Sequence, residues 1–162
     1  MTLKQAQPTS SVHARRGFSL AEVSVVLVIT AIISAMAIPR FSSSLTLRRV
    51  EGAARRVVAD LTFAQRHAKA TGVSQKVRFF AASARYRLDG VVDFDLGDAN
   101  YDVYLAKEPY GITMKSADFG GDGIVIFDVF GIPDSGGTVV IESGDHSRTI
   151  TVDADTGRAV SQ

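Results

Sequence analysis

The sequence predicts an α+β chain in which a long N-terminal helix, with a membrane-spanning first half, packs on a C-terminal antiparallel β-sheet or small β-sandwich. Three observations predict this class. Residues 18–38 form an apolar run with a single charge, Glu22. Residues 47–68 repeat apolar side chains in steps of three and four, which is the period of a helix. After Gly72 the period changes to two, and short strand-like segments follow.

The apolar run from Phe18 to Ile38 contains 21 residues. At about 1.5 Å per residue such a helix is roughly 30 Å long, which is the thickness of a bilayer core. A carboxylate in that environment costs on the order of 2.5–3.5 kcal/mol, so Glu22 is expected to have a partner. No Lys or Arg follows Glu22 within the run, and the partner must therefore come from outside it. Pro39 closes the run and is expected to bend a continuing helix.

The second half of the predicted helix, residues 40–71, is amphipathic. Lys69 lies in the last turn, where it favours the helix dipole, and Gly72 is a plausible stop. The apolar positions carry small Ala residues and precede a β-rich region, which favours packing on a sheet over a coiled-coil seam. The stripe consists of Leu47, Val50, Ala54, Val57, Leu61, Ala64 and Ala68.

Residues 72–162 read as a β-rich domain. Residues 73–81 alternate, with Val73, Gln75, Val77 and Phe79 on one side, and residues 84–88 are the expected hairpin partner. Residues 89–100 are acidic and are predicted to be a loop. The remaining strands are expected at residues 101–106, 111–115, 124–130, 138–142 and 148–152, with turns at 143–146 and 156–158. Whether they form one sheet or a sandwich stays open.

Composition narrows the function classes. The chain has 162 residues, a formal net charge of +1 and no cysteine. Disulfides, thiol catalysis and thiolate metal sites are therefore excluded. The small net charge gives no global attraction to nucleic acid. Lys4, Arg15 and Arg16 make the N-terminus basic, but Arg40, Arg48 and Arg49 lie beyond the apolar run, so charge alone does not set the membrane orientation.

Residues 15–22 read Arg-Arg-Gly-Phe-Ser-Leu-Ala-Glu ahead of the apolar run. This arrangement resembles the class III signal of type IV pilins and type II secretion pseudopilins. The resemblance implies that a prepilin peptidase cuts between Gly17 and Phe18 and methylates the Phe18 amine. Glu22 would then be the fifth mature residue and meet the amine of a neighbouring subunit, which sets the axial register, while Pro39 matches the helix-bending proline. The alternative is an ordinary signal anchor, and a cleaved secretory signal fits poorly because the apolar core is too long.

The C-terminal half extends the resemblance. Residues 131–133, 136–141, 147–152 and 156–158, with residues 64–68 late in the helix, resemble the GspH/FimT family of minor pilins and pseudopilins. Residues 89–121 match least. The implied organisation is a cleaved leader at residues 1–17, the transmembrane and assembly half of the helix at 18–39, its amphipathic half at 40–71 and a globular pseudopilin domain at 72–162.

The resemblance implies a minor pseudopilin, which is a structural subunit of a type II secretion pseudopilus. Its expected partners are other pseudopilins or pilins, the prepilin peptidase and the inner-membrane assembly platform. Its expected location is the inner membrane, in a single pass with the C-terminal domain in the periplasm, and then the tip of the fibre. The alternatives are a FimT-like type IV minor pilin, serving pilus assembly or DNA uptake, and a single-span domain unrelated to fibres.

No enzyme, cofactor or metal is expected. The chain has three histidines, His13, His67 and His146, and lacks both a Gly-x-Ser-x-Gly elbow and a phosphate-binding glycine loop. Asp118, Asp122 and Asp128 flank a glycine-rich turn, which leaves calcium as an alternative. This spacing is not that of an EF-hand, and such turns are ordinary hairpin chemistry.

DNA contact is the second alternative for the basic residues. Arg48, Arg49, Arg55 and Arg56 repeat at seven and share a helix face, which Arg85, Arg87, Arg148 and Arg158 would extend. Such contacts to phosphates are salt-sensitive and independent of sequence. In DNA-binding relatives, by resemblance, basic residues follow the final Gly. Here Gly157 and Arg158 are followed by Ala-Val-Ser-Gln, so a second basic residue is missing. The other interpretation is a solvated face, or contacts to lipid headgroups and neighbouring subunits.

Overall fold

A computed structural model describes residues 17–92 and 100–162, without the side chains of residues 36–43. The chain divides into two compact units, Met1–Arg40 and Phe41–Gln162, and each is described by itself. The basic leader up to Arg16, the acidic segment 93–99 and the side chain of Pro39 lie outside the described residues. The leader, the loop at 93–99 and the bend at Pro39 therefore stay predictions.

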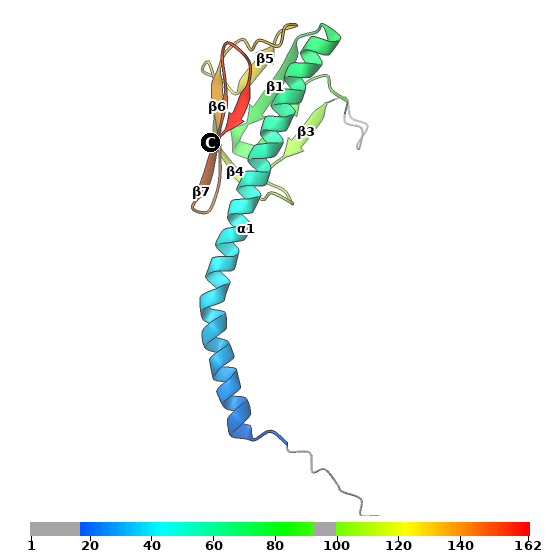
Figure 1. Ribbon diagram of the computed structural model, residues 1–162. Coiled ribbons are helices and arrows are strands. Elements are labelled where there is room, and N and C mark those ends of the chain that lie inside the picture. The colour runs from blue at the N-terminus through cyan, green and yellow to red at the C-terminus, as the bar shows by residue number, and fades with distance from the viewer. Residues whose placement is uncertain (1–16, 93–99) are drawn as a thin grey trace, which may run out of the picture. The chain divides into compact units, whose positions relative to one another are not determined.

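The long helix α1 spans Leu20–Thr71, close to the predicted range (Figure 1). Ser19 begins it, because its hydroxyl oxygen accepts the Ala21 N–H at 3.3 Å and its carbonyl accepts the Val23 N–H at 3.1 Å. Gly72 ends it with a φ of 66°, a left-handed conformation that favours glycine, and donates its N–H to the Ala68 carbonyl. Both ends of the helix thus follow from local sequence.

In the first unit, the apolar side chains of α1 are exposed on every side. Phe18 is 82% exposed and Leu20 87%. The larger apolar residues between Val23 and Ile33 are all exposed as well. None of the helical residues within 17–92 and 100–162 forms a segment that meets the length and apolarity of a bilayer span. A single-pass anchor therefore stays a prediction.

The second unit contains two four-stranded antiparallel sheets, which answers the question of one sheet or two. The first has the order β3 (Tyr101–Tyr104), β2 (Arg85–Leu88), β1 (Gln75–Phe80) and β5 (Ile124–Phe127). The second has the order β4 (Thr113–Phe119), β6 (Gly137–Ser143), β7 (His146–Val152) and β8 (Ala159–Ser161). A short 3₁₀ helix, η1 (Ala81–Ser83), joins β1 to β2. The predicted α+β class is confirmed.

Several predicted strand limits are wrong. The strand expected at 124–130 ends at Phe127, because the Asp128 carboxylate accepts the N–H groups of Phe130 and Ile132 and turns the chain. The strand expected at 111–115 runs instead from Thr113 to Phe119. Val73 is 65% exposed and precedes β1. The strand β8 was not predicted at all; it forms by pairing with β7.

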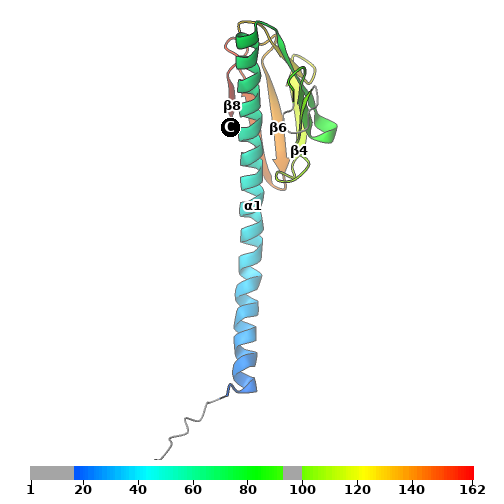
Figure 2. The ribbon, with the colours of Figure 1, turned by 90° about the vertical axis from the view of Figure 1, so that its right-hand side faces the viewer.

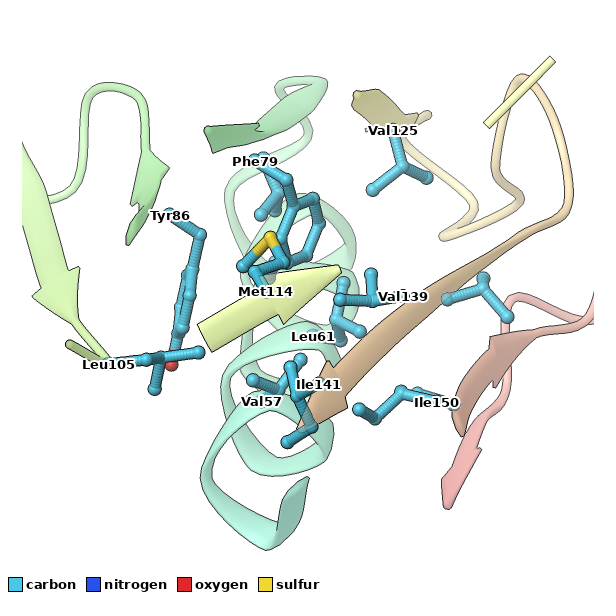
Figure 3. Packing of buried hydrophobic residues seen from close by; sticks show 14 of the residues in the cluster. Val57, Leu61, Phe79, Tyr86, Leu105, Met114, Val125, Val139, Ile141 and Ile150 are labelled. Carbon is cyan, nitrogen blue, oxygen red and sulfur yellow. The ribbon is translucent and has the colours of Figure 1, made fainter. Parts of the chain in front are cut away.

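One hydrophobic core joins α1 to both sheets. Figure 3 shows Val57 and Leu61 of α1 beside Val139 and Ile141 of β6. The predicted helix stripe is buried throughout, except for Leu47, which is half-buried, and Ala53 joins it. Burying one large apolar side chain contributes roughly 1.5–3 kcal/mol. This burial explains why the amphipathic half of α1 lies along the sheets in Figure 2.

Polar contacts also tie α1 to the sheet domain. The Gln65 side-chain amide donates to the carbonyls of Gly131 at 2.8 Å and Thr156 at 2.7 Å. These carbonyls belong to the loops after β5 and β7. Nearer the middle of the helix, the Arg148 guanidinium of β7 lies 3.1 Å from a carboxylate oxygen of Glu51. The contacts hold the helix against β7, against the loop after β7 and against the loop after β5.

Candidate functional site

The first candidate site is the start of α1. Gly17 and Phe18 precede the helix, and both are exposed. A Cβ built on Gly17 meets no atom within 4 Å. The peptide bond between Gly17 and Phe18 is thus outside regular structure and accessible, which is the local geometry that a protease requires.

Glu22 lies three residues after Ser19, in the first turn of α1. This Ser-x-x-Glu spacing is that of a capping box, and the helix dipole favours a carboxylate at this end. Within the described residues, no cation lies at ion-pair distance from Glu22. The prediction that its partner must come from outside the segment is consistent with this geometry.

The surroundings of Glu22 are apolar. Phe18, Val23, Val26 and Leu27 line a hollow of about 260 Å³ with it on the helix surface. A helix that is apolar on all faces is stable only when other apolar surface covers it. The carboxylate therefore lies on a surface suited to a lipid or helix partner, and a cation brought there by another chain would neutralise it.

The basic residues of α1 are the second candidate site. Arg49, Arg55 and Arg56 each lie within 4 Å of a carboxylate, that of Glu108 at 3.6 Å, Glu51 at 3.7 Å and Asp60 at 2.9 Å respectively. Arg48 is exposed and has no ion pair with any described residue. Most of the positive charge expected along this helix face is thus already compensated.

The cations expected to extend that face are distributed over other elements. Arg85 and Arg87 lie on β2 and share Asp102, at 3.2 and 2.8 Å. Arg148 pairs with Glu51. Arg158 is exposed beside β8 and lines a shallow hollow with Thr151, Asp153, Thr156 and Val160. The arrangement therefore offers phosphates isolated cations rather than a continuous track.

The histidines and the acidic turns lie apart on different elements in the described part. His67 is half-buried beside Phe63, with its Nδ1 buried and unpartnered, and His146 begins β7. Asp118, Asp122 and Asp128 each accept backbone N–H groups within their own turns. Over residues 17–92 and 100–162, no group of three or more His, Asp or Glu side chains is placed to hold a metal ion.

Sequence reasoning missed one group of charged residues. Arg78 of β1 pairs with Asp89 at 2.7 Å and lies on the same sheet face as Arg85 and Arg87. The sequence did contain a signal for this group. The segments that form β1 and β2 carry a cation at every second position, and in a strand such positions lie on the face opposite the buried side chains.

Comparison with known proteins supports the reading of the N-terminus. Residues 12–38 match the family model of the prokaryotic N-terminal methylation motif. The fold of the described residues is pilin-like. The pilin-like fold is also that of the type IV minor pilin FimU of Pseudomonas aeruginosa, with 16% identity, a TM-score of 0.52 and coverage of 71% of this chain and 89% of FimU.

The minor pseudopilin EpsH from the type 2 secretion system of Vibrio cholerae is similar to the same degree. Its identity is 15% and its TM-score 0.52, with coverage of 70% of this chain and 96% of EpsH. No curated protein matches the pilin-like chain with significant sequence similarity. At these identities the two structures show a shared fold.

Proposed function

We propose that this chain is a minor pseudopilin, a structural and non-enzymatic subunit of a type II secretion pseudopilus. The observation that carries the proposal is the methylation motif at residues 12–38, which includes Glu22 on an apolar helix, without an ion pair to any described residue. A prepilin peptidase cuts between Gly17 and Phe18 and methylates the new amine of Phe18. The inner membrane holds the unassembled subunit in a single pass, with the β-rich domain in the periplasm.

Assembly follows from the charges at the start of the helix. Cleavage creates a cationic amine at Phe18, and both this amine and the Glu22 carboxylate are costly in an apolar environment. Pairing between neighbouring subunits neutralises both charges at once and fixes the axial register. In this proposal, Pro39 bends the helix. The assembly platform inserts the subunit beside other pseudopilins, at the tip of the fibre.

A type IV minor pilin is the second candidate, and the fold similarity to FimU supports it as much as that to EpsH supports a pseudopilin. DNA uptake belongs to this candidate. The ion pairs of Arg49, Arg55 and Arg56 weigh against DNA uptake, because these cations already have carboxylate partners. A gel shift of the full chain that disappears between about 50 and 200 mM salt would favour DNA contact over the structural role alone.

Replacement of Glu22 by Ala tests the assembly role. We expect Glu22→Ala to insert into the membrane as well as the unchanged chain, because it removes a charge from the apolar run. Its incorporation into a fibre or tip complex is expected to fall by about tenfold or more, equivalent to about 1.4 kcal/mol. The measurement is the ratio of fibre-associated to membrane-associated subunit.

Ser24→Ala is the matched control, because Ser24 lies on the same exposed helix segment and its hydroxyl bonds only to the Ala21 carbonyl. It should assemble normally. Normal incorporation of Glu22→Ala would contradict the role proposed for this carboxylate.

A further inference from the structure

The first sheet has one face that is basic. In β1 and β2, buried Val77, Phe79, Tyr86 and Leu88 alternate with half-buried residues on the opposite face. Four of the residues on that opposite face are cations. They are called the basic face of the first sheet below: Lys76, Arg78, Arg85 and Arg87.

Two of these cations lie directly opposite one another. In the antiparallel register of β1 and β2, Arg78 lies directly across from Arg87. Like charges at such cross-strand positions destabilise a sheet. The two arginines are held by different carboxylates. The Nε of Arg78 lies 2.7 Å from Asp89, and Arg87 binds Asp102 through both Nε and Nη2, at 3.1 and 2.8 Å.

Among the described residues, the cations of this face outnumber the carboxylates. Asp102 is shared with Arg85, at 3.2 Å, and Lys76 has no ion pair with any described residue. Four cations therefore stand against two carboxylates among the described residues of this face. The Arg78 side chain is 40% exposed, and its two terminal nitrogens make no hydrogen bond to a described residue. With respect to the described residues, these nitrogens are available to a carboxylate in the bidentate geometry that arginine favours.

Apolar side chains lie among these charges. In the register of β1 and β5, Ile124 lies across from Arg78 and Ile126 across from Lys76. Both isoleucines are half-buried. The Arg85 guanidinium lies 4.1 Å from the ring centre of Phe80. A surface on which apolar side chains lie among arginines is typical of a protein–protein interface.

We propose that the basic face of the first sheet docks the carboxylate-rich surface of another protein. The excess of cations selects a partner with exposed Asp and Glu side chains, and Arg78 is its central contact. The inference goes beyond the proposed assembly role, because the face involves neither cleavage at Gly17 nor Glu22.

Nucleic acid fits this face less well. The aromatic rings that would stack bases already carry cations, because Arg85 lies over Phe80 and Lys107 lies 4.3 Å from the ring centre of Tyr104. Carboxylates of a protein partner, in contrast, can insert singly between guanidinium groups.

The test uses the full chain in detergent and a fluorescent glutamate peptide of about twelve residues as the carboxylate probe, measured by anisotropy. We expect the double variant Arg78→Gln/Arg87→Gln to weaken binding by about tenfold. The control, Arg48→Gln/Arg66→Gln, removes the same charge from exposed residues of α1 and should change binding by less than about twofold. Thermal melts verify that each variant is folded.

A single variant keeps the test decisive if the double variant fails to fold. Lys76→Gln removes no described ion pair and is expected to weaken binding about threefold. The proposal is overturned if the control weakens binding as much as the sheet variants, because net charge alone would then explain it. It is equally overturned if the unchanged chain does not bind the peptide, or if duplex DNA binds more tightly and loses affinity in the same variants.

Discussion

Tyr86 shows how a single residue joins the helix to the first sheet. Its ring is 1% exposed, and its hydroxyl donates to the Asp60 carboxylate on α1 at 2.5 Å. Arg56 binds the same carboxylate at 2.9 Å. Burial, followed by the nearby charge of Asp60, raises the pKa of Tyr86 well above its ordinary value. The phenol is thus held in its protonated, donating form.

Tyr86→Phe removes this bond and leaves the ring in place. We expect the free energy of unfolding to fall by about 1–2 kcal/mol, because Asp60 loses one partner but keeps Arg56. Tyr104→Phe is the control, since Tyr104 is 41% exposed and its hydroxyl makes no bond to a described residue. Chemical denaturation measures both.

The same pair predicts a dependence on pH. A raised folded-state pKa contributes stability that is complete below the unfolded value of about 10 and is lost as the pH rises. The free energy of unfolding should therefore decrease above about pH 10, and this decrease should be smaller in Tyr86→Phe. An equal decrease in both proteins would show that Tyr86 is not the group responsible.

At the scale of elements, Gln65 fastens two loops to the last turns of α1. Gln65→Ala leaves the carbonyls of Gly131 and Thr156 without this donor. We expect a loss of about 1–2 kcal/mol in the free energy of unfolding. Arg66→Ala changes the neighbouring exposed residue and should have little effect. If the two variants were equally stable, the amide would not be holding the loops.

The elements that could be predicted are those whose signal is local. The stripe from Val50 to Ala68 has a helical period over several turns, and the alternation around Val77 and Phe79 has the period of a strand. The strand β8 has no such signal. Its three residues, Ala-Val-Ser, become a strand only because β7 offers an edge, and an edge is a property of the fold.

The division into two sheets was also beyond the sequence. β1 pairs with β5, some fifty residues later, and this choice depends on packing rather than on local pattern. The candidate sites differ in the same way. Gly17, Phe18 and Glu22 are close in sequence and could be recognised there. The juxtaposition of Arg78 with Arg87 depends on the register of a hairpin and appears only in the structure.

At the scale of the whole molecule, the two units differ in how far their apolar side chains are exposed. In the described part, residues 41–162 bury their apolar stripe in a core, whereas the apolar side chains between Phe18 and Ile33 remain exposed. A chain with this second property needs a further apolar environment. In the proposed function, membrane insertion followed by assembly into a fibre of helices would supply this environment, and processing at Gly17 would come between these two steps.

The most direct test is the intact mass of the full chain after co-expression with a prepilin peptidase. We expect the loss of residues 1–17 and the gain of one methyl group at Phe18. Gly17→Lys, which places a large charged side chain before the cleaved bond, is the control and should stay unprocessed. An unprocessed unchanged chain, with the peptidase active on a known substrate, would contradict the proposed pseudopilin.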